Sequence, residues 1–201
     1  MRMPQSAMLH PFDMFLPSGY SIPRMTTRLA RHASVLLVFL VLSLLWLRPL
    51  PTHFASRFPG EIDVWIQAWN QWWMDKALLE LHVNPWVTDY AFHPTGVELY
   101  FHAFSPLNSL LAVPLRHLCG PVVALNLVFL ATFVLSGYGA YLLAHRLTGS
   151  ALAGFVAGYV YAFSPYHFDR VNQLEHATIQ WFPFLLLALW RLTETRTKRW
   201  G

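Results

Sequence analysis

Two carboxylates, Glu61 and Asp63, lie just beyond an apolar run that covers residues 33–47. A carboxylate in this position could act as a general base and take the proton of an acceptor hydroxyl. It could instead help to hold a divalent cation, Mg or Mn, on a sugar phosphate. The alternative without chemistry is a solvated acid at the beginning of a helix, where the helix dipole favours negative charge. Asp63 is the stronger candidate, because Glu61 precedes the expected helix.

A helix rich in tryptophan is expected directly after these acids, over about residues 62–82. Its tryptophans are Trp65, Trp69, Trp72 and Trp73. Spacings of four and three place them on one face of the helix. An aromatic belt at the headgroups of a membrane would explain such a face without any further function. Stacking on a sugar or on a prenyl chain is the functional alternative, and we assign it to Trp65 and Trp69, with Glu61 beside them.

A second group of ionisable residues lies between two later apolar runs, in the segment SPYHFDRVNQLEHATIQ. It contains Asp169, Arg170, Glu175 and His176. Arg170 could bind a phosphate through its planar fork of donors, and Asp169 or Glu175 could join Asp63 across a shared cleft. His176 is a further candidate for contact with a substrate. Mutual salt bridges at a helix end are the alternative without function.

Neither histidine nor cysteine predicts a metal site. The spacing of the histidines at 93, 102 and 117 matches no pattern of metal ligands. The single cysteine, Cys119, excludes a disulfide within the chain. We therefore predict no metal ligand, and a divalent cation would have to rest on the carboxylates.

The composition is typical of an integral membrane protein. Of the 201 residues, 55% are hydrophobic and 12% are charged, whereas soluble domains carry about 25% charged residues. The net charge of +4 does not indicate nucleic acid, because the basic residues flank apolar runs, where they set topology. We predict an all-α bundle of about four membrane spans. The spans are expected at residues 31–49, 122–144, 148–165 and 177–192.

Details of the last two spans can also be predicted. The third contains Gly154 and Gly158, a spacing that lets a neighbouring helix approach closely. Pro183 is expected to kink the fourth.

The run at residues 104–118 is short and interrupted by proline, so it could span the membrane or lie flat in the interface. If it spans, the basic end of the chain falls outside, against the positive-inside rule. If it lies flat, Arg146 and the basic residues after position 190 are all cytoplasmic. We therefore predict an outer loop at 50–121 with two interfacial helices, and a second outer loop at 164–180.

The N-terminal part of the chain is predicted to be cytoplasmic. Residues 1–28 are rich in proline and aperiodic, and we interpret them as a flexible tail that precedes a membrane module at 29–201. No small-residue cleavage site follows the first apolar run, so that run reads as an uncleaved signal anchor.

The order of these elements resembles the N-terminal part of the GT-C superfamily of membrane glycosyltransferases. One span, a long outer loop with an acid near its beginning, two interfacial helices, and two spans joined by a tight basic turn follow one another as in that superfamily. The phrases FHPTG, FSPLNSLLAVPL and YAFSPYHF are similar to its large, uncharacterised bacterial members. The similarity covers roughly residues 30–201, and its motifs are loose.

The resemblance implies transfer of a sugar from a polyprenyl-phosphate donor to an acceptor at the outer face of a bacterial plasma membrane. Asp63 then takes the place of the catalytic acid of the first loop, and Asp169, or else Glu175, that of the second. Because these enzymes have more spans than four, we expect the chain to be truncated at its C-terminus, with a second chain completing the bundle.

The competing hypothesis is a membrane scaffold or subunit without catalysis, or an inactive fragment of such an enzyme. Transporters place ionisable groups within their spans, and the predicted spans have none in their apolar cores, which disfavours transport. Loops that meet in one cleft would favour the enzyme, and widely separated loops would favour the scaffold.

Overall fold

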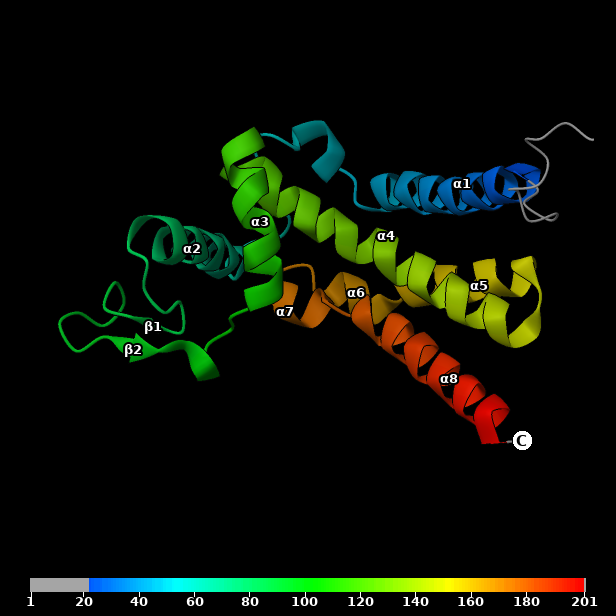
Figure 1. Ribbon diagram of the computed structural model, residues 1–201. Helices are drawn as coiled ribbons and strands as arrows, with labels where there is room; N and C mark the ends of the chain where they lie inside the picture. The colour runs from blue at the N-terminus through cyan, green and yellow to red at the C-terminus, as the bar shows by residue number, and fades with distance from the viewer. Residues whose placement is uncertain (1–21, 201) are drawn as a thin grey trace, which may run out of the picture. The chain divides into compact units, whose positions relative to one another are not determined.

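The computed structural model describes residues 22–200 and is mostly helical (Figure 1), which confirms the all-helical class. Most of the predicted N-terminal tail lies outside the described residues. The chain divides into two compact units, residues 1–35 and 36–201. Helix α1 (Ile22–Trp46) begins in the first unit and ends in the second. All contacts described below lie within the second unit.

Three further helices follow in the apolar part of the chain. They are α4 (Pro121–Thr148), α5 (Ala151–Ala162) and α8 (Trp181–Trp200). Helix α4 begins with proline at its first turn, where the missing N–H costs nothing. It ends at Gly149, which has a left-handed φ of 72°. The Ser150 hydroxyl then accepts the Ala153 N–H at 3.2 Å and caps α5, so the turn between the two helices is tight.

Two helices among the described residues are long and apolar enough to cross a membrane, the stretch Leu29–Trp46 of α1 and the whole of α4. They correspond to the first and second predicted spans. Helix α5 has 12 residues, fewer than the roughly 20 that a bilayer requires. Helix α8 has 20 residues, but its second half is polar and basic.

Close packing of α4 on α5 dominates the second unit. A Cβ added to Gly158 of α5 would lie 2.5 Å from the Gly137 carbonyl oxygen of α4 and 2.5 Å from Cζ of Phe39. Phe39, from α1, is fully buried and fills the space over both glycines. The predicted close approach at Gly154 and Gly158 is confirmed, and its partner is α4.

The long segment between α1 and α4 folds into helices and a hairpin. After a 3-10 turn at Leu50–His53 come α2 (Val64–Asp75), a π-helical turn (Lys76–Glu80), strands β1 (Val87–Thr88) and β2 (Val97–Glu98), a 3-10 turn (Leu99–Phe101) and α3 (Pro106–Cys119). The strands pair antiparallel, with Val87 opposite Glu98. Figure 1 shows α3 running across the direction of α4, with α2 and the hairpin beyond it. Helices therefore occupy both places where interfacial helices are predicted.

The tryptophan face of α2 differs from the prediction. Trp73 is buried and donates its Nε1–H to the Pro85 carbonyl at 2.9 Å. Trp72 and Trp73 both pack on Tyr90, at 5.7 and 5.5 Å between ring centres. The hairpin thus covers most of the tryptophan face of α2. The helical spacing alone predicts that this face would meet lipid headgroups. Trp65 is the exception and is 66% exposed.

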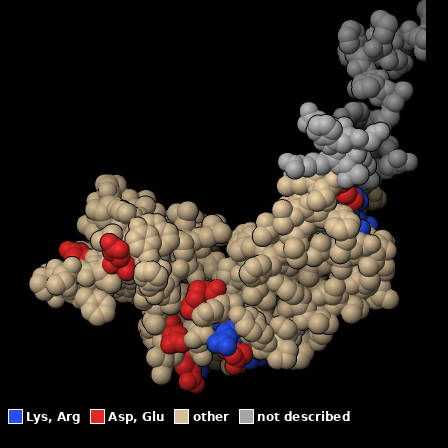
Figure 2. Space-filling model, turned by 90° about the horizontal axis from the view of Figure 1, so that it is seen from below, with Lys and Arg blue, Asp and Glu red and all other residues tan. Residues whose placement is uncertain are grey.

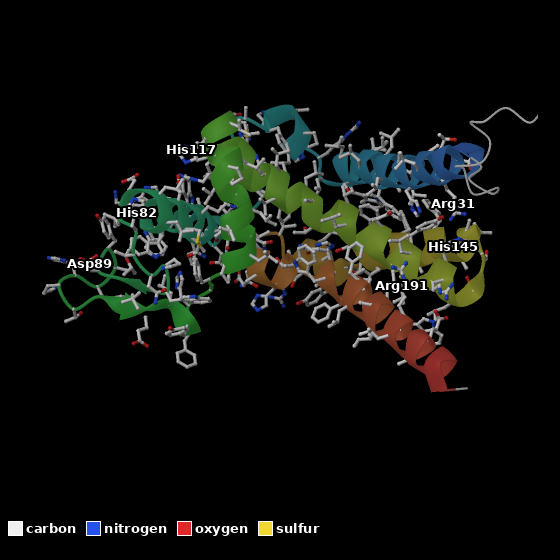
Figure 3. All side chains as sticks on the ribbon, viewed as in Figure 1. Arg31, His82, Asp89, His117, His145 and Arg191 are labelled. Carbon is white, nitrogen blue, oxygen red and sulfur yellow. The ribbon has the colours of Figure 1, made fainter. Side chains whose placement is uncertain are left out.

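Charged groups separate toward the two ends of the helices. Figure 3 shows His145 and Arg191 at one end, and His82, Asp89 and His117 at the other. At the first end Arg146 pairs with Glu194, and at the other Asp75 accepts from His117 at 2.9 Å.

Candidate functional site

The two predicted outer loops meet beside the beginning of α2. The second loop contains two short helices, α6 (Pro165–Asp169) and α7 (Leu174–Ala177). Its Asn172 accepts the Glu61 backbone N–H through Oδ1, at 2.5 Å. Gly60 has a φ of 85°, and a Cβ there would collide with the Asn172 side chain. The close approach of the loops therefore requires glycine at this position.

Asp63 faces the second loop. It immediately precedes α2, yet its carboxylate accepts no N–H from the helix. Its Oδ2 instead accepts the Gln173 amide N–H at 3.2 Å. The carboxylate is half-buried, so it remains accessible to a ligand while one hydrogen bond fixes its direction. Its position directly before α2 still agrees with the alternative of an acid placed at the positive end of the helix dipole.

Glu175 is the acid of the second loop that reaches α2. Its Oε2 accepts the Gln67 Nε2–H at 2.5 Å. Gln67 is only 2% exposed and lies one helical turn after Asp63, so both residues project from the same face of α2. The two carboxylates, Asp63 and Glu175, are therefore presented to one side of the helix, one directly and one through an amide.

Asp169, predicted as the second catalytic acid, has no described hydrogen bond or ion pair to the first loop. Its side chain is 69% exposed and its one described partner is Arg170, at 3.3 Å. Arg170 also donates to Gln173 Oε1 at 2.9 Å, and its guanidinium lies 5.6 Å from the centre of the Tyr166 ring. Gln173 thus links the arginine to Asp63. The structure brings Arg170 to the site through this amide and leaves Asp169 outside it.

The remaining predicted residues divide into accessible and packed groups. His176 is 55% exposed in its side chain, with Nδ1 at 3.6 Å from Glu175 Oε1. Trp65 is open to solvent and makes an edge contact with Phe58 at 5.2 Å. Trp69 stacks on Trp73 instead, at 6.2 Å. Of the two tryptophans, only Trp65 has a face that is free for a ligand.

Three amides of this site, Gln67, Asn172 and Gln173, were missed by the sequence reasoning. Each donates to or accepts from a group across the two loops. The signal was present, since Gln67 follows Asp63 at helical spacing, and Asn172 and Gln173 lie between the two acids of the second loop. Figure 2 shows acidic side chains, with a basic group among them, gathered near the middle of the lower edge of the molecule, while a wide uncharged surface extends to one side.

Within residues 22–200, no three side chains of His, Cys, Asp or Glu form a group that could hold a metal ion. The site offers two carboxylates from different loops, each already hydrogen-bonded to an amide.

His167 anchors the second loop beneath the site. Its ring is fully buried and stacks on Phe133 of α4, with ring centres 3.8 Å apart. Nδ1 lies 2.8 Å from the Ala162 carbonyl and Nε2 lies 3.3 Å from the Thr132 hydroxyl. Burial lowers the pKa of His167 below its usual value, and the carbonyls of Ala162 and Ala177 act in the opposite direction.

This lowered pKa predicts a loss of stability in acid. Below a pH of about 6.5 the unfolded chain binds a proton that the folded chain does not, so the free energy of unfolding falls by up to about 1.4 kcal/mol per pH unit until the folded pKa is reached. Thermal unfolding in detergent between pH 7 and 5 should show this slope, and His167→Gln should reduce it. The exposed His93→Gln is the control, and an equal slope in wild type and His167→Gln would refute the assignment.

Comparisons with protein families, with curated proteins and with solved structures found no match to this chain. Its chemistry therefore has to be inferred from the site itself. That site consists of two carboxylates from different loops, the amides that hydrogen-bond to them, and an arginine that is linked to Asp63 through Gln173.

Proposed function

We propose that this chain is the N-terminal module of a glycosyltransferase in a bacterial plasma membrane. It would move a sugar from a polyprenyl-phosphate donor to an acceptor at the outer face. The observation that carries the proposal is the pair of contacts between loops, Gln173 to Asp63 and Gln67 to Glu175. These contacts join acids that are distant in sequence at one potential binding face, as a shared substrate requires.

Four spans with a cytoplasmic N-terminus provide the membrane arrangement. Helices α1 and α4 meet the requirements of length and hydropathy. Support for the other two comes from their exposed apolar side chains, such as Leu152 and Val160 on α5 and Leu185 and Leu189 on α8. Apolar surface of this extent needs lipid or a partner chain to cover it. A second chain that completes the bundle would cover part of this surface.

The chemistry follows from the positions of the charged groups. Asp63 takes the proton of the acceptor hydroxyl, whose oxygen attacks the anomeric carbon of the donor. The bond from that carbon to the phosphate oxygen breaks, and its electron pair leaves with the lipid phosphate. Arg170 stabilises the negative charge on this leaving group, while Glu175 accepts a hydrogen bond from the acceptor and orients it.

A comparison of the two acids of the second loop tests this assignment. Glu175→Gln should lower transfer by about tenfold to a hundredfold, because the amide keeps a hydrogen bond to Gln67 but loses the charge that strengthens its hydrogen bond to the acceptor. Asp169→Asn should change transfer less than twofold. The measurement is release of polyprenyl phosphate from a radiolabelled polyprenyl-phosphate hexose in membranes that contain the chain. A large loss in Asp169→Asn with normal transfer by Glu175→Gln would reverse the assignment.

The second candidate function is a membrane scaffold or subunit. It is favoured by the exposed aromatic side chains of the hairpin region, since Phe92 is 77% exposed and Phe101 is fully exposed. Such a surface suits a protein partner. Absence of transfer, together with release of a bound partner by Phe101→Ser, would favour the scaffold over the enzyme.

A further inference from the structure

A hollow of about 530 Å³ lies where the end of α1 meets the second loop. Its basic side is formed by Arg48, His53 and Arg57. Phe58 and Phe168 contribute apolar walls. None of the catalytic candidates described above uses this basic side.

The two arginines of this hollow have no ion-pair partner among the described residues. The other arginines with described ion pairs, at positions 116, 146 and 170, all face carboxylates. Glu61 also lines the hollow, but its side chain is exposed and forms no ion pair. Two arginines and one carboxylate that pairs with neither leave a net positive pocket. Because arginine presents a planar fork of donors, this pocket suits a phosphate or a carboxylate.

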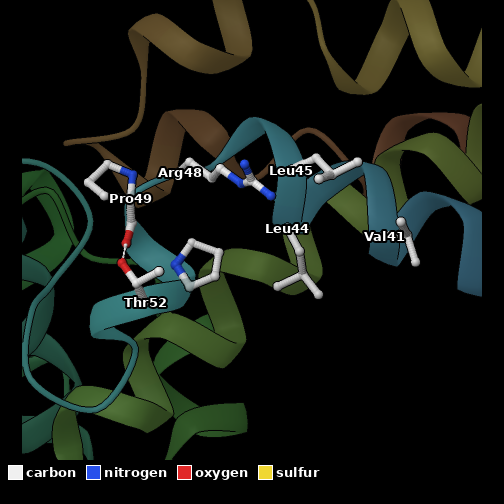
Figure 4. A pocket seen from close by; sticks show the side chains of 7 residues that line it. Val41, Leu44, Leu45, Arg48, Pro49 and Thr52 are labelled. Atoms are coloured by element: carbon white, nitrogen blue, oxygen red, sulfur yellow. Dashed lines mark hydrogen bonds between the residues drawn. The ribbon is translucent and has the colours of Figure 1, made fainter.

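An apolar groove of about 420 Å³ continues from the basic side and shares Arg48 and Pro49 with it. Its wall is formed by Val41, Leu44 and Leu45 of α1. Figure 4 shows the Arg48 side chain lying along the same wall, with Thr52 opposite. Val41 and Leu45 are about half exposed, and they belong to a helix that is apolar enough to cross a membrane. The groove is therefore suited to a hydrocarbon chain.

The basic side is held in place by α4. Asn126, which is fully buried, donates its amide hydrogens to the Phe54 and Arg57 carbonyls at 2.7 and 2.8 Å. These two bonds fix the backbone at Arg57 beside the end of α1. A ligand would thus meet a preformed site and would not have to order this loop.

We propose that this site binds a lipid phosphate ester. The phosphate would lie between Arg48 and Arg57, with His53 beside it, and one hydrocarbon chain would lie along Val41 and Leu45. The apolar groove next to the basic pocket selects an amphiphile over a free anion. A membrane phospholipid with a terminal phosphate and a prenyl phosphate share this chemistry. The inference requires α1 to be in the membrane, but it does not require sugar transfer.

Native mass spectrometry of the full chain in detergent tests the site. The probes are dioleoyl phosphatidic acid, farnesyl phosphate and dioleoyl phosphatidylcholine. We expect one phosphatidic acid or one farnesyl phosphate to bind at least tenfold more tightly than phosphatidylcholine. Arg48→Gln and Arg57→Gln should each weaken this binding about tenfold, since each removes one charged hydrogen-bonding group. A preference for farnesyl phosphate would identify a prenyl-phosphate site, and a preference for phosphatidic acid a phospholipid site.

Arg146→Gln is the matched control, because it removes the same charge at a residue paired with Glu194 outside the hollow. Its binding should equal that of the wild type. Equal affinity for phosphatidylcholine, or an equal loss in Arg146→Gln, would overturn the proposal. Displacement of the lipid by inorganic phosphate at the same concentration would also overturn it, because charge alone would then explain the binding. Variants of Asp63 that lose transfer should still bind, so the two proposals can fail separately.

Discussion

Asp63→Asn should lower sugar transfer by about 10² to 10⁴-fold while the chain still folds and inserts. The amide has the same size as the carboxylate and can still accept the Gln173 N–H that fixes Asp63 at 3.2 Å. It cannot take the proton of an acceptor hydroxyl, so the loss should fall on the chemical step. The measurement is the rate of transfer from a radiolabelled polyprenyl-phosphate hexose under saturating donor.

Asp89→Asn is the control for this result. Asp89 lies in the same predicted outer loop and is exposed, and Figure 3 places it well away from the bundle. Its substitution makes the same change of charge without touching the site, so transfer should stay at the wild-type rate. Normal transfer by Asp63→Asn would remove this carboxylate from the mechanism.

Gly158→Ala should lower the free energy of unfolding by about 2–3 kcal/mol, as expected for an overpacked core. The added methyl would lie 2.5 Å from the Gly137 carbonyl oxygen, which belongs to the backbone of α4 and cannot rotate away. Helices α4 and α5 would have to separate, and Phe39 would lose its contacts with both. Thermal unfolding in detergent measures the effect.

Val160→Ala provides the comparison, because Val160 lies on the same helix but is 63% exposed. Shortening this exposed side chain should change the midpoint temperature of unfolding little. If Gly158→Ala and Val160→Ala unfold at the same temperature, the close contact between α4 and α5 does not contribute to stability.

Much of the fold could be predicted from the sequence where a single local pattern decides the structure. The apolar runs predict α1 and α4, because each is an apolar stretch long enough to form a helix that could cross a membrane. The spacing of Gly154 and Gly158 predicts a close helix contact, which the structure has. Helical spacing also predicts the tryptophan-rich helix, although it ends as an α-helix at Asp75 and continues as a π-helical turn.

Features that depend on distant partners could not be predicted in the same way. Trp73 is buried because the hairpin folds over α2 and supplies Tyr90, and helical periodicity contains no information on that contact. Similarly, the sequence does not show whether Asp169 or Glu175 belongs to the site, because both are acids in the same loop. Only the fold shows that Gln67 reaches Glu175 while Asp169 faces solvent. Neighbouring side chains from another loop thus decide which acid belongs to the site.

The most direct test is a disulfide between the two loops, formed in Glu61→Cys/Asn172→Cys with Cys119→Ser. The Glu61 N–H contacts the Asn172 side chain, so these positions should cross-link rapidly when an impermeant oxidant is added outside sealed, right-side-out vesicles. The pair Glu61→Cys/Asp89→Cys should not cross-link under the same conditions. If the first pair stays reduced, or reacts only after the vesicles are opened, the loops do not meet on the outer side and the proposed transferase site does not exist.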